Sequence, residues 1–266
     1  MNLPAYEPKL SIESILQPGE IPKVYVSTSV PYFSKEFTPS QLFAKSASVA
    51  ISSLSGTDIL TADSTFNQYT CLWQPYFVGS TAIREDEQYS LHVEYGGEAF
   101  DAQTTTNIRA VSIDSVSYVQ AFSDLYGEHE GVVVDFSDLP GEGDHYRYRM
   151  DRDLSASKDT LNNCNTGSYA AREIGRVIYS DQGHDGLPVR FVIEPAFKHK
   201  AGDETIVYVE SLDKGSAAFF DELDKQKEAK INPFIEPIFL RSRIPGAIGV
   251  FGAAGLSAPI RFVYPE

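Results

Sequence analysis

The stretch EQYSLHVEYGGEAF, Glu87 to Phe100, contains the clearest fold signal in the sequence. Polar and apolar residues alternate along it, and its apolar side chains would share one face of an extended chain: Tyr89, Leu91, Val93 and Tyr95. A period of two is typical of a half-buried antiparallel strand. The glycine pair at positions 96 and 97 allows a tight turn into a second strand. This stretch therefore predicts a β-hairpin.

Short segments of the same kind recur along the first hundred residues, separated by turns. They are KLSIESIL (9–16), KVYVSTSVPYF (23–33), ASVAISSL (47–54) and QYTCLW (68–73). Strands at intervals of about ten residues are typical of an immunoglobulin-like or transthyretin-like sandwich. The hydrophobic pattern pauses at residues 103–110 and strands then resume. We therefore expect a mainly β protein with such a sandwich over residues 1–108 and a second antiparallel β domain over residues 109–266.

One segment of the second domain departs from the strand pattern. KGSAAFFDELDKQKEAK, Lys214 to Lys230, is rich in helix-forming residues, and Ala217, Phe220 and Leu223 fall at helical spacing. Ser216 is a candidate cap, and the residues 232–234 (NPF) form a stop signal. We expect one amphipathic helix at about residues 215–230. We favour packing on a sheet over binding of a partner helix.

Charge and cysteine content narrow the function classes. The formal net charge is −15, which disfavours binding to nucleic acid or to an anionic lipid surface. No apolar run approaches the roughly 20 residues that span a bilayer. The first residues do not resemble a signal sequence, so the chain is either cytoplasmic or a mature form whose export signal was removed. Cys71 and Cys164 match no metal-site spacing, and two separate thiols are favoured over a bridge between domains.

No catalytic or metal-binding set is evident. The best metal candidate is DQGHDG, Asp181 to Gly186, but an EF-hand loop that starts there would place Gly183 third and Val192 twelfth, where oxygen ligands are needed. A turn is favoured, and a weak calcium site that uses Asp181 and Asp185 stays open. The five histidines form no zinc motif, and no nucleophile elbow is present. We therefore assign no catalytic, cofactor or metal residue and expect a protein that is not an enzyme; a hydrolase with an unrecognised carboxylate site is the least favoured reading.

Two further stretches have more than one interpretation. IPGAIGVFGAAGLSAP, Ile244 to Pro259, has glycine at every third position, but a strand and not a helix follows, which argues against a phosphate loop. We expect it to be extended or bulged and buried, with Phe251 as its anchor. In CLWQPYF, the aromatic residues Trp73, Tyr76 and Phe77 could stack on sugars, although packing into the core is favoured.

The C-terminal part of the chain resembles the end of a known family. The matching features are ESLDK (210–214), the aromatic pair at 219 and 220, and the glycine-rich run 244–253. Earlier segments match in order: YEPKLSIES (6–14), VYVSTSVPYF (24–33), YSLHVEYGGEAFDAQTTT (89–106), LPGEGDHYRYRM (139–150) and DGLPVRFVIEP (185–195). The chain is thus similar to the family catalogued as domain of unknown function 4249, which consists of lipoproteins of Bacteroidota outer membranes.

This resemblance implies a function that depends on contacts with other proteins. Members are thought to be non-enzymatic accessory subunits of TonB-dependent transporters or related outer-membrane barrel complexes. We expect a lipid-anchored protein at the outer membrane, at the cell surface, with a β-barrel transporter as partner; the lipidated cysteine is not in this chain. The alternative is a cell-surface adhesion or glycan-binding module. The resemblance transfers no ligand-binding residue.

Overall fold

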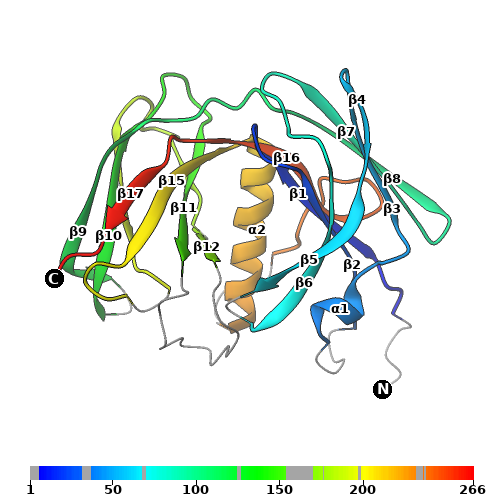
Figure 1. Ribbon diagram of the computed structural model, residues 1–266, viewed down its shortest axis with the longest axis horizontal. Coiled ribbons are helices and arrows are strands. Elements are labelled where there is room, and N and C mark those ends of the chain that lie inside the picture. Colours follow the sequence, from blue (N-terminus) through cyan, green and yellow to red (C-terminus); the bar gives the residue numbers. More distant parts are fainter. Residues whose placement is uncertain are drawn as a thin grey trace. The chain divides into compact units, whose positions relative to one another are not determined.

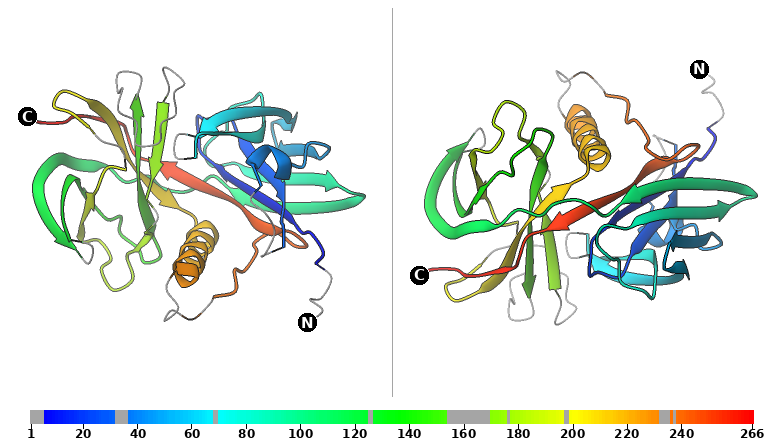
Figure 2. Two further views of the ribbon diagram at one scale, coloured as in Figure 1. Left: turned by 90° about the horizontal axis from the view of Figure 1, so that it is seen from below. Right: turned by 90° about the horizontal axis from the view of Figure 1, so that it is seen from above.

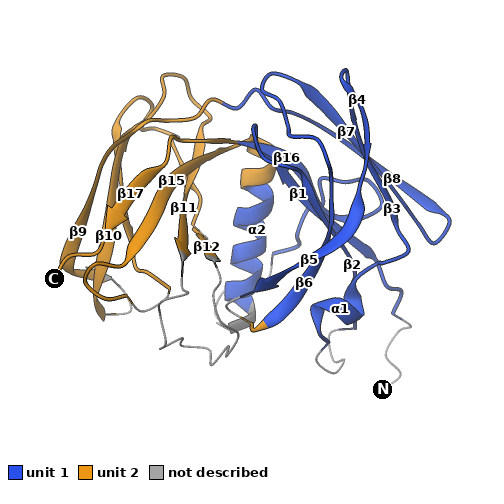
Figure 3. Ribbon diagram, in the orientation of Figure 1, with its two compact units in different colours: residues 1–67, 72–108, 218–254 blue, residues 68–71, 109–217, 255–266 orange. Residues whose placement is uncertain are grey.

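The computed structural model describes residues 6–31, 37–67, 70–124, 127–153, 170–175, 177–196, 199–231, 236 and 238–266. It confirms a mainly β protein with several antiparallel sheets and one long helix (Figure 1). The chain divides into two compact units, shown in different colours in Figure 3. Unit 1 contains residues 1–67, 72–108 and 218–254, and unit 2 contains residues 68–71, 109–217 and 255–266.

Most of the elements are labelled in Figure 1, and they follow one another along the chain in the order of their numbers. Those of unit 1 are β1 (Leu10–Leu16), β2 (Lys23–Thr28), α1 (Pro39–Leu42), β3 (Ser48–Ser53), β4 (Gly56–Ile59), β5 (Thr61–Asn67), β6 (Leu72–Val78), β7 (Gln88–Tyr95) and β8 (Glu98–Thr105). Those of unit 2 are β9 (Ile113–Asp124), β10 (Gly127–Ser137), β11 (His145–Asp153), β12 (Ala170–Ile174), β13 (Tyr179–Ser180), β14 (Pro188–Ile193), β15 (Glu204–Leu212) and β17 (Ile260–Val263). The helix α2 (Lys214–Ile231) begins in unit 2 and continues in unit 1, whereas β16 (Ile248–Leu256) begins in unit 1 and ends in unit 2.

The predicted hairpin is present as β7 and β8, a long antiparallel pair that the two views of Figure 2 show from opposite sides. Tyr89, Leu91 and Val93 are buried, whereas His92 and Glu94 face solvent or are half-buried on the other side. The pair belongs to a sheet with the strand order β4-β3-β7-β8. The alternation therefore reports a real division between core and solvent.

The glycine-rich stretch forms β16 and is buried along most of its length, as expected. β16 pairs in parallel with β1, and β1 pairs in antiparallel with β2. Phe251 is 5% exposed and belongs to the apolar core of unit 1, together with Ile12, Val24 and Leu91. The prediction of a buried, extended segment anchored by Phe251 is confirmed.

Unit 2 has its own core between two groups of strands. β10 pairs with β9 and β14, whereas β11 pairs with β12, β13 and β15, and β15 pairs with β17. Large apolar side chains fill the space between them, among them Phe136, Tyr146, Met150 and Val207. The regular alternation of β11 places Tyr146 and Met150 in this core.

The expected helix is α2, but a different residue caps it. The carboxylate of Asp213 accepts hydrogen bonds from the backbone N–H and the hydroxyl group of Ser216, so Asp213 and not Ser216 has the capping role. The predicted stop at residues 232–234 lies outside the described residues. Across the described ranges, no helix has the length and apolar character needed to cross a membrane.

The division into units differs from the contiguous division at residue 108. The structure changes unit between Ile108 and Arg109, but residues 218–254 return to unit 1. The reason is the parallel pairing of β16 with β1, which joins residues near the two ends of the chain. Such pairing leaves no local signal in the sequence.

Candidate functional site: three aspartates in unit 2

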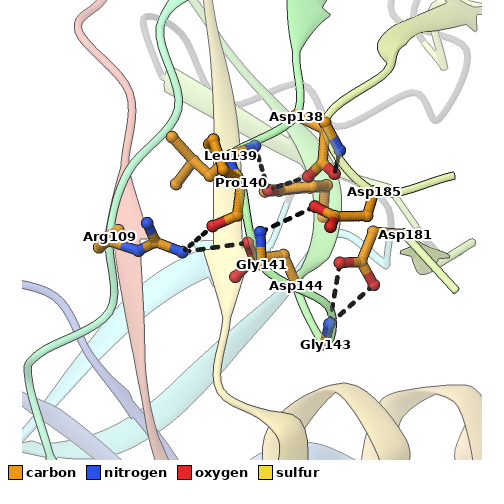
Figure 4. A network of polar contacts seen from close by, with 11 residues as sticks. Arg109, Asp138, Leu139, Pro140, Gly141, Gly143, Asp144, Asp181 and Asp185 are labelled. Carbon is orange, nitrogen blue, oxygen red and sulfur yellow. Dashed lines mark hydrogen bonds and ion pairs between the residues drawn. The ribbon is translucent and has the colours of Figure 1, made fainter.

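Three aspartates from different parts of unit 2 converge at one place. Asp138 follows β10, Asp144 precedes β11, and Asp181 follows β13. Each offers a carboxylate oxygen, and these oxygens lie within 4.8 Å of one another. Figure 4 shows how the three side chains and their partners lie around the loop 138–144. Among the described residues, these three aspartates form a group whose carboxylate oxygens lie close enough together to hold a metal ion.

Burial makes this cluster unusual for acidic residues. Asp181 is 0% exposed and Asp138 is 5% exposed, whereas the side chain of Asp144 is 25% exposed. Buried carboxylates are costly unless hydrogen bonds or opposite charges compensate for the lost water. The partners of each carboxylate therefore indicate what the cluster does.

The partners of Asp138 lie in two segments of unit 2. Its Oδ1 accepts a hydrogen bond from the Tyr146 hydroxyl group at 2.5 Å, and its Oδ2 accepts one from the backbone N–H of Gly186 at 2.8 Å. Burial and this hydrogen bond raise the pKa of Tyr146 well above its usual range, so the phenol stays protonated and remains a donor. Asp138 thereby links the end of β10 to β11 and to the turn before β14.

Asp181 and Asp185 hold the loop that precedes β11. Both oxygens of Asp181 accept from the backbone N–H of Gly143, at 3.0 and 2.8 Å, and Oδ1 of Asp185 accepts from Gly141 at 2.8 Å. Both glycines have positive φ angles, of 110° and 115°, a conformation that turns these N–H groups toward the aspartates and that side chains disfavour. The glycines of LPGEGD (139–144) and the two aspartates therefore fix the conformation of this loop together.

The surroundings of Asp144 disfavour the charged form of its carboxyl group. Burial raises its pKa, the nearby charges of Asp138 and Asp181 raise it further, and the guanidinium group of Arg109 opposes the change. The Arg109 Nη2 atom lies 3.5 Å from Asp144 Oδ2 and also donates to the Pro140 carbonyl oxygen at 3.2 Å. Arg109 therefore supplies a positive charge beside Asp144, at the loop 138–144.

The three carboxylates could supply oxygen ligands to a hard cation such as Ca²⁺. Asp138 and Asp181 are, however, already used as hydrogen-bond acceptors that order two turns, and Asp144 has a cationic neighbour. The geometry thus accounts for the cluster as a structural clamp. Weak calcium binding by Asp181 and Asp185 stays a hypothesis; Asp185 is not a member of the converging group, and its Oδ1 accepts from the backbone N–H of Gly141.

The segment DQGHDG itself forms successive turns, as the sequence favours. His184 donates its backbone N–H to the Asp181 carbonyl oxygen, and Leu187 donates to that of His184. These turns connect β13 to β14, which pair with different strands and not with each other. The side chain of His184 is exposed and contacts the carbonyl oxygen of Gln182.

A second polar cluster of unit 2 surrounds His199 and has no counterpart in the sequence reading. Its imidazole ring stacks on Tyr264 with ring centroids 4.0 Å apart, and Nε2 lies 3.0 Å from the Tyr118 hydroxyl group and 3.3 Å from Glu130. Arg152 stacks on the Tyr264 ring as well and faces Glu173 at 3.6 Å. Burial lowers the pKa of His199, which favours the neutral form of the ring. The sequence gives no signal for this cluster because its six members come from six separate segments.

The aromatic residues of CLWQPYF divide between core and surface. Tyr76 and Phe77 are 5% and 4% exposed, which confirms the favoured interpretation for these two. Trp73 is 59% exposed, so that interpretation is wrong for the third. The Phe77 end of β6 lies in the core and the Trp73 end lies at the surface, so the burial of its side chains decreases from Phe77 to Trp73.

The structure corrects the reading of the cysteines as free thiols. Cys71 is disulfide-bonded. The sequence contains one other cysteine, Cys164, which lies outside the described residues. The spacing of two cysteines in a chain cannot predict a bridge, because it does not report which segments meet in the fold.

The fold and these clusters define a β-rich protein in which buried polar groups order turns and link neighbouring strands. Comparison with known protein families shows the family to which the chain belongs. Residues 1–257 match the family described as Domain of unknown function (DUF4249), and the chain belongs to this family. No curated protein matches the chain.

Proposed function

We propose that this protein is a non-enzymatic, lipid-anchored accessory subunit of an outer-membrane barrel complex of the TonB-dependent transporter type, at the cell surface. The observation that carries the proposal is the disulfide bond of Cys71. Structural disulfides form and persist in oxidising environments, among them the bacterial periplasm and the cell surface, and are rare in the cytosol. Of the two origins left open by the sequence, the mature form of an exported protein therefore fits better.

The charge of the chain and its fold are consistent with a protein that acts through contacts. The net charge of −15 repels phosphate groups, which argues for a protein partner and not for nucleic acid or an anionic lipid surface. Two mainly β units, each with its own apolar core, provide rigid surfaces for such a contact. A lipid anchor at the N-terminal side would keep the protein at the membrane without a binding surface for lipid.

The acidic cluster supports a role outside catalysis. A general acid or base needs a carboxylate that can reach a substrate, but Asp181 is fully buried and both of its oxygens accept from Gly143. Asp138 is likewise bound to Tyr146 and Gly186. Asp144 is the remaining member, and its neighbour Arg109 is a counter-charge.

Purification of the protein from native membranes tests this proposal. A tagged chain expressed at its natural level should sediment with the outer membrane and co-purify with a large β-barrel protein in a fixed ratio. A tagged chain without its export and lipidation signals is the matched control, because it should remain soluble and without the barrel. Recovery of the lipidated protein alone, after mild solubilisation and chemical cross-linking, would count against the accessory role.

A further inference from the structure

The single tryptophan of the chain is a surface residue. Trp73 lies on β6 and is 59% exposed, whereas Phe77 on the same face of the strand is 4% exposed and packs against Phe43. Burying a large aromatic side chain is strongly favourable, so an indole ring left in water forgoes that stabilisation. The ring therefore contributes little to the apolar core of unit 1 and is accessible to a ligand.

The indole ring is held in a defined orientation. Phe66 on β5 is its direct cross-strand partner, and the two rings meet edge to face with centroids 5.6 Å apart and an interplanar angle of 69°. Pro75 follows two residues later on the same strand and is half-buried, so that it extends the apolar strip on that face. A side chain fixed by such contacts loses little freedom when a ligand binds to it.

A hydroxyl group borders this apolar strip. Ser64 is the cross-strand partner of Pro75, lies on the same face as Phe66 and is exposed, whereas Thr61 and Thr65 lie on the opposite face of β5. The apolar strip is therefore small, with the size of two rings and a proline, and a hydroxyl group lies at its edge. A protein–protein interface needs a larger apolar centre than this.

We propose that Trp73, Phe66 and Pro75 form a stacking site for a neutral carbohydrate. The C–H face of a pyranose ring is apolar and matches an exposed indole ring, while its hydroxyl groups can bond with water and with Ser64. The net charge of −15 disfavours phosphorylated or otherwise anionic ligands. This inference deepens the proposed function, on which it rests, because it names neutral glycans as the substrate class that the complex would take up.

The tryptophan provides its own readout. Because Trp73 is the only tryptophan, fluorescence excited at wavelengths that tyrosine does not absorb reports on this site alone. We expect titration with neutral hexasaccharides (cello-, xylo-, malto- and chitohexaose as the panel) to give a saturable change of emission with at least one of them. Calorimetry with the same sugar should then show a loss of affinity of about tenfold or more for Trp73→Ala.

Two further variants separate stacking from a general effect on the fold. Phe66→Ala keeps the fluorophore but removes its support, and should weaken binding several-fold while leaving the thermal unfolding of unit 1 nearly unchanged. Ile59→Ala, at an apolar residue of β4 that is 73% exposed, is the matched control and should leave the affinity unchanged.

The outcomes also separate this inference from the proposed function. A panel with no saturable change, or binding that Trp73→Ala does not weaken, would overturn the stacking site even if the chain still co-purifies with a barrel. Conversely, sugar binding that depends on Trp73 in a chain that never associates with a barrel would retain the site and refute the accessory role.

Discussion

Gly249 of β16 faces Ile12 of β1 so closely that a Cβ atom on Gly249 would lie 1.7 Å from the Ile12 carbonyl oxygen. The φ angle of Gly249 is +145°, which side chains disfavour, and the clash is with backbone that cannot move aside without opening the strand pair. At position 249, the close approach of β1 and β16 thus explains why the C-terminal stretch has a glycine.

Gly249→Ala should therefore destabilise the protein severely, by about 3 kcal/mol or more, because both strain and lost pairing contribute. Gly19→Ala is the matched control: its φ angle is also positive, at +84°, but no atom lies within 4 Å of the added Cβ. We expect the control to cost only about 1 kcal/mol. Urea unfolding measures both, and equal effects would contradict the role of the Ile12 contact.

The clamp role of the aspartates predicts unequal effects within one cluster. Asp181→Ala should cost about 1–3 kcal/mol, because it removes a fully buried, charged acceptor whose two oxygens both bond with the backbone N–H of Gly143. Asp185→Ala, at an exposed residue that accepts one bond from Gly141, should cost about 1 kcal/mol or less. Chemical unfolding of both variants provides the comparison.

The same role predicts the response to calcium. Millimolar calcium should leave the unfolding temperature of the full chain unchanged, because the aspartate oxygens already have donors or a counter-charge. A rise that disappears in Asp144→Asn would show instead that the cluster binds the ion, since this variant removes a ligand charge but keeps both turns clamped.

Two histidines should give opposite contributions to the pH dependence of stability. Burial lowers the pKa of His199, with Arg152 acting in the same direction and Glu130 and Asp203 in the opposite one. The unfolded chain then binds a proton more readily than the folded one, so stability is lost as the pH falls below the unfolded value of about 6.5. His199→Gln should make unfolding less sensitive to acid in this window.

His92 is the internal comparison. Hydrogen bonds to Asp101 and Glu94 raise its pKa, so its contribution is present below the unfolded pKa and is lost as the pH rises through the folded pKa. His92→Gln should therefore remove stability at acid pH, although the effect is small at this exposed site. Unfolding temperatures measured from pH 5 to pH 8 would contradict both assignments if the two variants shifted in the same direction.

The disulfide bond predicts sensitivity to reduction. Cys71→Ser should lower the stability by about 2–4 kcal/mol, since a crosslink restricts the unfolded chain. A reducing agent should have the same effect on the wild-type protein and none on the variant. Additive effects of the two would show that the bond is absent from the protein in solution.

Particular elements show what the sequence could and could not predict. The β7–β8 hairpin and α2 were predictable because their patterns are local, with a period of two and of about 3.6 residues. The pairing of β1 with β16 was not, because residues more than two hundred positions apart meet through backbone hydrogen bonds, which depend little on the type of side chain.

The candidate sites show the same limit. Asp138, Asp144 and Arg109 converge with Asp181 only after β10, β11 and β13 have assembled, so the sequence alone pointed to Asp181 and Asp185. For Trp73, Tyr76 and Phe77, the residue types are alike, and the position at which β6 leaves the core decides which ring is exposed. That position depends on the neighbouring strands.

The most direct test of the account is the composition of the complex that this protein forms in its native membrane. Affinity purification of the naturally expressed, tagged protein, followed by mass spectrometry and native mass measurement, should show one large outer-membrane β-barrel in a fixed ratio to this chain. Recovery of the chain without a barrel, or from the cytosolic fraction with Cys71 reduced, would contradict it.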